Sequence, residues 1–189
     1  MKITETNRDK LLDTTFKHVY RYGYHGASTA SILAEAGVPK GSMYHHFASK
    51  EGMVLAMIEE RLAPVMAHYY DFSIPKGGTA VAILEHTFRA MSDNTRLMTY
   101  GCPLHRLMQE TRAHDEAIYH ACTTIYAELH GRLARLLRSD PTQYADPETL
   151  AEAIILTTWG LLSRPLDDDP SAAFLEGARR LLQNIKDPV

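Results

Sequence analysis

The sequence predicts an all-α protein of about nine helices. Across its 189 residues, apolar side chains recur at helical spacing in nearly every segment, and no stretch keeps the strict alternation of a half-buried strand. Glycine- and proline-containing breaks separate these segments. The chain is long enough to bury one core or two small ones, and we expect two domains, residues 1–50 and residues 51–189.

The first fifty residues predict three helices and the start of a fourth. Apolar positions share one face of a helix over residues 6–22, which Gly23 ends. The second helix opens at Ser28, a good N-cap, and stops before Gly37. A third, barely two turns long, covers residues 40–46.

The rest of the chain continues the helical pattern. A helix from Ser49 to about Tyr70 is expected to kink at Pro64. Further helices are predicted over residues 79–95, 103–112, 114–137, 148–163 and 171–186. Two of them are expected to start at prolines, which suit the first turn of a helix.

The segment between Ser28 and His46 has a helix, a glycine turn and a short helix, the geometry that lays one helix in the major groove of DNA. In the turn, Gly37 adopts a positive φ angle without steric cost, and Val38 fills the angle between the helices. Gly41 disfavours a helix by about 1 kcal/mol relative to alanine. Its missing side chain would let the backbone approach DNA closely, which is a reason to find it there.

Donors on this segment are candidates for DNA contacts. Lys40 can read guanine through O6 and N7, and Ser42 can contact either a base or a phosphate. Tyr44 and Lys50 suit phosphates, as do the N–H groups at helix starts. The predicted DNA-binding residues are Ser28, Thr29, Lys40, Gly41, Ser42, Tyr44, His45, His46 and Lys50.

The charge distribution fits an amino-terminal DNA-reading head, residues 1–50, on a separate body, residues 51–189. The whole chain has a net charge of −3, but residues 1–50 carry +3 and the remainder carries −6. The excess is modest, so it supports the motif and does not stand without it.

An ordinary helical hairpin with Met43 and Phe47 in its core is the alternative to a DNA-binding motif. Against it, the chain combines the pieces Gly37-Val38, Lys40-Gly41, Tyr44-His45-His46-Phe47 and Ser49-Lys50-Glu51. These pieces closely resemble the DNA-binding signature of TetR/AcrR-family transcriptional regulators, and the resemblance covers residues 8–56.

The resemblance implies an all-helical homodimer in which three helices read DNA and about six form a ligand-binding body. It implies repression relieved by a small molecule, and it places Thr29, Lys40, Gly41, Ser42, Tyr44, His45, His46 and Lys50 on DNA. One departure is Pro39, where many members have serine or threonine. Pro39 removes a hydroxyl cap and a possible phosphate contact.

Large apolar side chains in the body could line a pocket for an apolar or aromatic effector, although each could also be simple core. The candidates are Met66, Tyr69, Tyr70, Phe88, Met91, Met108, Tyr126 and Trp159.

Cys102 adds a second possibility, because Gly101-Cys102-Pro103 is similar to a segment of family members that sense electrophiles or oxidants. A reactive thiol there would draw on a helix start and on His105 and Arg106. The alternative is a small buried residue at a tight bend.

The remaining expectations concern partners and compartment. The two amphipathic helices at the end of the chain are expected to form a homodimer, as in the family, and a dimer would bind a palindromic operator on double-stranded DNA. The first ten residues lack the apolar core of a signal peptide, no stretch is long enough for a membrane span, and two cysteines are too few for a disulfide framework. We therefore expect a cytoplasmic protein with reduced thiols and no membrane partner.

An enzyme is the main competing class. None of the ten histidines has a histidine partner three or four residues away, and Cys-x-x-Cys, phosphate-binding and dinucleotide-binding motifs are absent. The segment Gly26-Ala27-Ser28-Thr29-Ala30 only half resembles a nucleophile elbow. We expect no catalysis, no metal and no cofactor. A helical interaction module is a third class, and it would lack salt-sensitive affinity for DNA.

Overall fold

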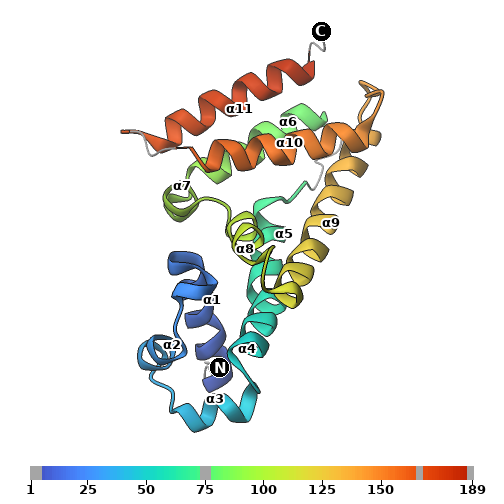
Figure 1. Cartoon of the computed structure of the whole chain (residues 1–189). Helices are drawn as coiled ribbons and strands as arrows, with labels where there is room; N and C mark the ends of the chain where they lie inside the picture. The colour runs from blue at the N-terminus through green and yellow to red at the C-terminus, as the bar shows by residue number, and fades with distance from the viewer. Residues whose placement is uncertain (1–5, 73–77, 165–167, 187–189) are drawn as a thin grey trace, which may run out of the picture. The chain divides into compact units, whose positions relative to one another are not determined.

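The computed structural model describes residues 6–72, 78–164 and 168–186, and these ranges are helical with no strand (Figure 1). The all-α prediction is therefore confirmed. The helices in chain order are α1 Asn7–Gly26, α2 Thr29–Ala36, α3 Lys40–His46, α4 Lys50–Met57, α5 Ala63–Tyr69, α6 Ala80–Ser92, α7 Thr95–Tyr100, α8 Pro103–Thr111, α9 Glu116–Arg138, α10 Pro147–Leu162 and α11 Pro170–Lys186. A π-helical segment, η1 Ile58–Leu62, joins α4 to α5.

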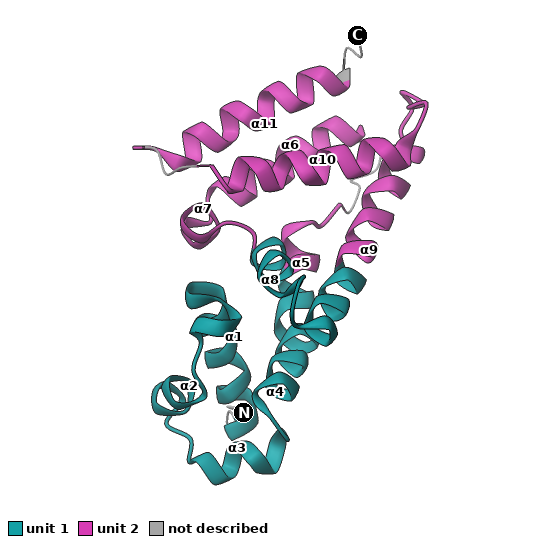
Figure 2. Cartoon of the chain, viewed as in Figure 1, with its two compact units in different colours: residues 1–65, 103–125 teal, residues 66–102, 126–189 magenta. Residues whose placement is uncertain are grey.

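The chain divides into two compact units that each combine distant segments (Figure 2). Unit 1 contains Met1–Val65 and Pro103–Ile125, and unit 2 contains Met66–Cys102 and Tyr126–Val189. The predicted boundary between two domains at residue 50 remains a prediction. The units show, however, that α8 and the first part of α9 pack with the amino-terminal helices.

In unit 1, α1 packs against α2, α3, α4, η1 and α8. Leu11 and Leu12 of α1 are completely buried, as are Met53 of α4 and Ile118 of α9. Because α2, α3 and α4 all pack on α1, this helix positions them relative to one another.

The helix boundaries predicted for the head hold well, because they rest on local chemistry. The Ser28 hydroxyl accepts a hydrogen bond from the Ser31 N–H at 3.0 Å, which caps α2. Gly37 ends the helix in the left-handed conformation, with φ 65°. Gly23 interrupts α1 with φ 80° and ψ 171°, and helical hydrogen bonding resumes as far as Gly26.

The helix predicted from Ser49 to Tyr70 changes geometry before Pro64. The Ala63 N–H donates to the carbonyl of Ile58, a five-residue step of the π segment. Pro64 has no N–H of its own to donate, and a wider turn before a proline relieves the clash of its ring with the preceding turn.

The predicted helix over residues 79–95 is wrong at its carboxyl end. α6 stops at Ser92, and the Asn94 side chain accepts the Leu97 N–H at 2.9 Å to begin α7. Asparagine is a strong N-cap, so the local capping bond prevails over the apolar periodicity that suggested one longer helix.

In unit 2, α11 packs against α6, α7 and α10. The rings of Phe88 and Phe174 meet edge to face at 6.0 Å between α6 and α11. At the start of α6, buried Asp140 accepts the backbone N–H of Ala80. Among the described residues, no helix is long and apolar enough to cross a membrane.

Candidate nucleic-acid interface and effector cavities

The short helix α3 is held by its apolar side. Met43 is completely buried and Phe47, which follows the helix, is 6% exposed. Ile32 from α2 is also fully buried, and Val38 in the turn is 4% exposed, as predicted for a residue that fills the angle between the helices. These four side chains fix α3 against the head, so the opposite side of the helix is presented to solvent.

The solvent side of α3 carries the predicted donors. Lys40, Gly41, Tyr44, His45 and His46 are all exposed. The Lys40 ammonium lies 5.9 Å from the centre of the Tyr44 ring, a cation–π distance, and Tyr44 is 52% exposed. The Lys40 ammonium and the Tyr44 hydroxyl are both donors suited to phosphate oxygens, and both are carried by the short helix that follows the glycine turn.

Three other predicted contacts differ in their exposure. Ser42 is half-buried, and its hydroxyl accepts a hydrogen bond from the Asn7 side chain at 3.4 Å. Ser28 is exposed and Thr29 is half-buried at the start of α2. The side chain of Pro39 gives α3 no capping hydrogen bond, which agrees with the loss of the hydroxyl expected at this position.

Lys50 differs from the other predicted phosphate contacts, because its ammonium is already bound. It donates to the backbone carbonyl of Tyr24 at 2.6 Å and lies 4.5 Å from the centre of the Tyr24 ring. Burial lowers the pKa of Lys50, and the carboxylates of Glu110 and Asp115 partly oppose that shift. A phosphate contact by Lys50 stays a prediction, and it would compete with the Tyr24 carbonyl.

A set of ion pairs ties α1 to η1. Arg8 pairs with Glu60, and Arg61 pairs with Asp9 at 2.9 Å and with Asp13 at 2.5 Å. The hydrogen bond from Arg8 lowers the pKa of Glu60. Sequence reasoning missed these pairs, since their members are about fifty residues apart and carry no local signal.

The predicted effector residues do not gather in one site. Tyr69 and Met91 line a cavity of about 390 Å³ between α5 and α6 in unit 2. His68, His86 and Asn94 also line it, and Asn94 donates to the Tyr69 hydroxyl at 3.0 Å. The lining of this cavity combines apolar side chains such as Ile83 and Met91 with hydrogen-bonding groups, which is the composition of a small-molecule site.

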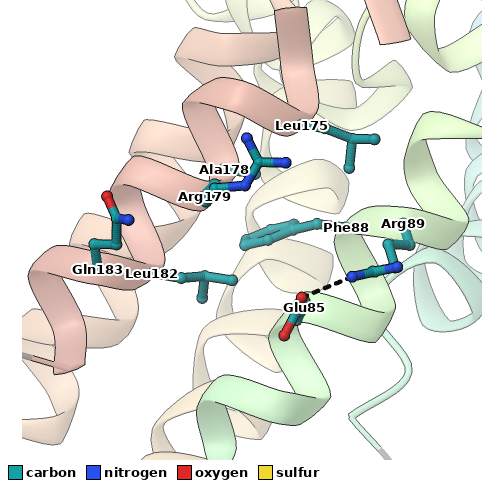
Figure 3. Close-up of a pocket in the computed structure, with 8 residues that line it drawn as sticks. All are labelled: Glu85, Phe88, Arg89, Leu175, Ala178, Arg179, Leu182 and Gln183. Atoms are coloured by element: carbon teal, nitrogen blue, oxygen red, sulfur yellow. Dashed lines mark hydrogen bonds and ion pairs between the residues drawn. The ribbon is translucent and has the colours of Figure 1, made fainter. Parts of the chain in front are cut away.

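Phe88 lines a different cavity of about 400 Å³, between α6 and α11 (Figure 3). Leu175, Ala178 and Leu182 supply its other apolar walls, and Figure 3 shows the Phe88 ring pointing between the two helices. Glu85 pairs with Arg89 at the rim at 2.8 Å.

The other candidates line neither of these two cavities. Met66 and Trp159 are 2% and 4% exposed, and Tyr126 packs its ring 5.4 Å from Trp159. Tyr70 is 4% exposed, and burial raises the pKa of its hydroxyl well above the usual value, with Cys102 adding to the shift. Met108 is half-buried and belongs to unit 1.

The redox alternative is not favoured by the surroundings of Cys102. The thiol directly precedes α8, as predicted, but it is 1% exposed. A sensing thiol must be reached by the oxidant and must ionise, and burial opposes both. Cys122 is likewise buried, and burial raises its pKa to about 12. In the described part of the chain, no cluster of three or more histidine, cysteine or acidic side chains could hold a metal.

Comparison with known proteins agrees with the geometry of the head. The family model described as "Bacterial regulatory proteins, tetR family" matches residues 11–57. The transcriptional regulator AcuR of Cereibacter sphaeroides is 28% identical over 175 residues, which covers 87% of this chain and 80% of AcuR. The repressor NemR of Escherichia coli is 41% identical over 56 residues, 30% of this chain and 28% of NemR.

Solved structures extend the similarity over both units. A TetR regulatory protein from Rhodobacter sphaeroides superposes with a TM-score of 0.76 at 27% identity, covering 91% of this chain and 96% of that protein. The reduced form of E. coli NemR superposes with a TM-score of 0.77 at 22% identity, covering 95% of each chain. The second likeness concerns the fold alone.

Proposed function

Because the chain belongs to the TetR family of DNA-binding transcriptional regulators, we propose that α3 reads an operator in the major groove through the exposed donors on its solvent side. The main observation in support is that this seven-residue helix has one buried side and one exposed side. Met43 is fully buried, whereas Lys40, Gly41, Tyr44, His45 and His46 are exposed. Any amphipathic helix exposes polar residues, but here the exposed side chains are an ammonium, a phenol and two imidazoles, all hydrogen-bond donors suited to DNA, beside a glycine that leaves the backbone open.

We further propose that the protein is a repressor that a small apolar or aromatic effector releases from DNA. The cavity lined by Tyr69 and Met91 supports this part of the proposal, since it has room for a small ligand and offers the Tyr69 hydroxyl, the Asn94 amide and two imidazoles to orient it. Catalysis forms no part of the proposal. The protein would act in the cytoplasm, where an operator is accessible.

The proposed dimer forms through α10 and α11 and would bind a palindromic operator. Leu156 of α10 supports it: this large apolar side chain is 51% exposed, and Ala153, Thr157 and Gly160 beside it are exposed too. Small neighbours around an exposed leucine let a second helix approach closely, which suits a helix-to-helix contact between two copies.

The test of DNA reading starts from the free protein and randomised double-stranded DNA. The selected sequence is then titrated by fluorescence anisotropy at two salt concentrations with wild type and Tyr44→Ala. Tyr22→Ala is a matched control, because Tyr22 is 53% exposed against 52% for Tyr44, and its ring also lies beside a cation, Arg21, at 5.2 Å.

Salt-dependent binding that Tyr44→Ala loses and Tyr22→Ala keeps would support the proposal. If Tyr44→Ala and Tyr22→Ala bound the selected DNA with equal affinity, the role of α3 would be refuted. If selection returned no sequence at all, a helical interaction module would be the better account. The effector part is tested separately with a compound library: a ligand must raise Tm and release the selected DNA, and Met91→Trp, which fills the cavity, should abolish both effects.

A further inference from the structure

The end of α1 is tied to α8 by a two-oxygen contact. The backbone N–H of Tyr24 donates to Oε2 of Glu110 at 2.7 Å, and the N–H of His25 donates to Oε1 at 2.8 Å. One carboxylate thus binds two successive amides, both of them in unit 1 with Glu110. Charge-assisted hydrogen bonds of this kind are about twice as strong as neutral ones, and a pair of them also fixes orientation.

The chain is shaped to receive this carboxylate. Gly23, immediately before the two amides, has φ 80° and ψ 171° and breaks the helical geometry of α1. A Cβ atom at this position would lie 2.6 Å from Oε2 of Glu110. Glycine is therefore favoured for its backbone angles, and any side chain here would push the Glu110 carboxylate away from its present position.

The same stretch of backbone also meets α4. The carbonyl of Tyr24 accepts the Lys50 ammonium at 2.6 Å. Tyr24 lies four residues before the N-cap of α2, and Lys50 is the first residue of α4. The backbone shortly before α2 and the first residue of α4 are therefore joined at Tyr24, whose N–H binds Glu110 and whose carbonyl binds Lys50.

The charges around this point are mutually compatible. His25 pairs with Asp115, with 3.1 Å between Nε2 and Oδ2, so a second carboxylate from the chain that follows α8 reaches the same turn. Glu110 and Asp115 both favour the charged form of Lys50. Two carboxylates, one ammonium and one imidazole thus surround the last turn of α1.

We propose that Glu110 is a positioning residue for DNA reading, although it lies more than fifty residues beyond the segment that matches the family model. Its carboxylate restrains a turn that contains a glycine and would otherwise rotate easily. Without it, the helices of the head still form, but a smaller fraction of molecules presents α2 and α3 in the binding orientation. The apparent Kd rises in proportion, because it equals the intrinsic Kd divided by the competent fraction.

The inference rests on the proposed DNA reading and is tested on the same selected operator with the full-length protein. Glu110→Ala removes both acceptors, and Glu110→Gln keeps one acceptor oxygen. Glu128→Gln removes the same charge from an exposed position on α9, and Leu137→Ala destabilises the other unit by removing a fully buried side chain. Affinity is measured well below the Tm of every variant, beside hydrogen exchange at the amides of Tyr24 and His25.

We expect Glu110→Ala to weaken DNA binding at least tenfold and to accelerate exchange at both amides. Glu110→Gln should lie between Glu110→Ala and wild type in both measurements. Glu128→Gln and Leu137→Ala should keep wild-type affinity, although the latter lowers Tm. If Glu110→Ala fails to fold, the Glu110→Gln affinity decides.

Accelerated exchange with unchanged affinity would overturn the positioning role, since the contact would then be structural only. Loss of affinity in Leu137→Ala as well would also overturn it, because affinity would then follow stability. Failure of the DNA reading itself looks different: wild type would bind no selected sequence, and both proposals would fall together.

Discussion

Gly41→Ala should change stability and DNA affinity in opposite directions. Gly41 lies in α3 with a helical backbone, and a Cβ atom built there would meet nothing within 4 Å. The fold therefore does not require glycine at this position. Alanine is favoured over glycine inside a helix by up to about 1 kcal/mol. For a chain of this size, that gain corresponds to a Tm increase of roughly 2–4 °C.

DNA binding of the same variant should weaken. If the backbone of α3 lies close to the DNA at Gly41, a methyl group must push the helix away and lengthen the contacts made by its neighbours. A loss of about 1.4 kcal/mol corresponds to a tenfold higher Kd, and we expect at least this much. The assays are thermal unfolding by circular dichroism and fluorescence anisotropy on the selected operator.

Gly131→Ala is the control for helix propensity. Gly131 is inside α9, and a Cβ atom there would lie 3.5 Å from a guanidinium nitrogen of Arg135, an ordinary contact with the end of a flexible side chain. Gly131→Ala should raise Tm without changing the DNA affinity. If Gly41→Ala binds the operator as tightly as wild type does, α3 does not approach DNA at this residue, and the reasoning from its glycine is refuted.

Three further outcomes follow from the structure. Asp140→Asn should lower the free energy of unfolding by about 1–2 kcal/mol at neutral pH. Burial alone would raise the pKa of Asp140, but hydrogen bonds from Ala80 and Thr142 lower it below the unfolded value. The difference in free energy of unfolding between wild type and Asp140→Asn, measured by urea unfolding, should therefore shrink as pH falls through the folded pKa. The Cys122 thiol, with its pKa near 12, should resist a thiol-reactive dye at pH 8 until the protein unfolds, and fast labelling would contradict its burial. Leu156→Lys should yield monomers by light scattering and weaken operator binding, whereas a dimer of wild-type strength would place the interface elsewhere.

Features that depend on neighbouring residues were predicted best. The caps at Ser28 and Gly37 follow from the chemistry of one residue and its next three or four, and both are found where expected. The inward position of Val38 and the exposed donors of α3 follow from the same short pattern. The residues of a helix-turn-helix lie close together in the sequence, so local patterns predict nearly all of its structure.

Features that depend on distant contacts were not predicted. Glu110 binds amides 85 and 86 residues earlier in the chain, and nothing in the sequence near Glu110 marks it. Apolar composition identified Tyr69, Phe88 and Met91 as pocket residues but could not separate core from cavity wall, and the structure assigns them to two different cavities. Which apolar side chains face a cavity depends on how helices pack, and periodicity does not encode this.

The variants at Gly41 and Glu110 together separate two accounts of DNA binding. If affinity simply followed the stability of the head, Gly41→Ala, which should stabilise the fold, would bind DNA at least as well as wild type. Glu110→Ala removes two hydrogen bonds and should destabilise the fold. DNA reading by α3 with Glu110 as a positioning residue requires both variants to lose affinity, one through direct contact with DNA and the other through the orientation of the helices. Opposite shifts in Tm with losses of affinity in both cannot arise from a single dependence on stability, so that pattern would require surface and orientation to act as separate determinants.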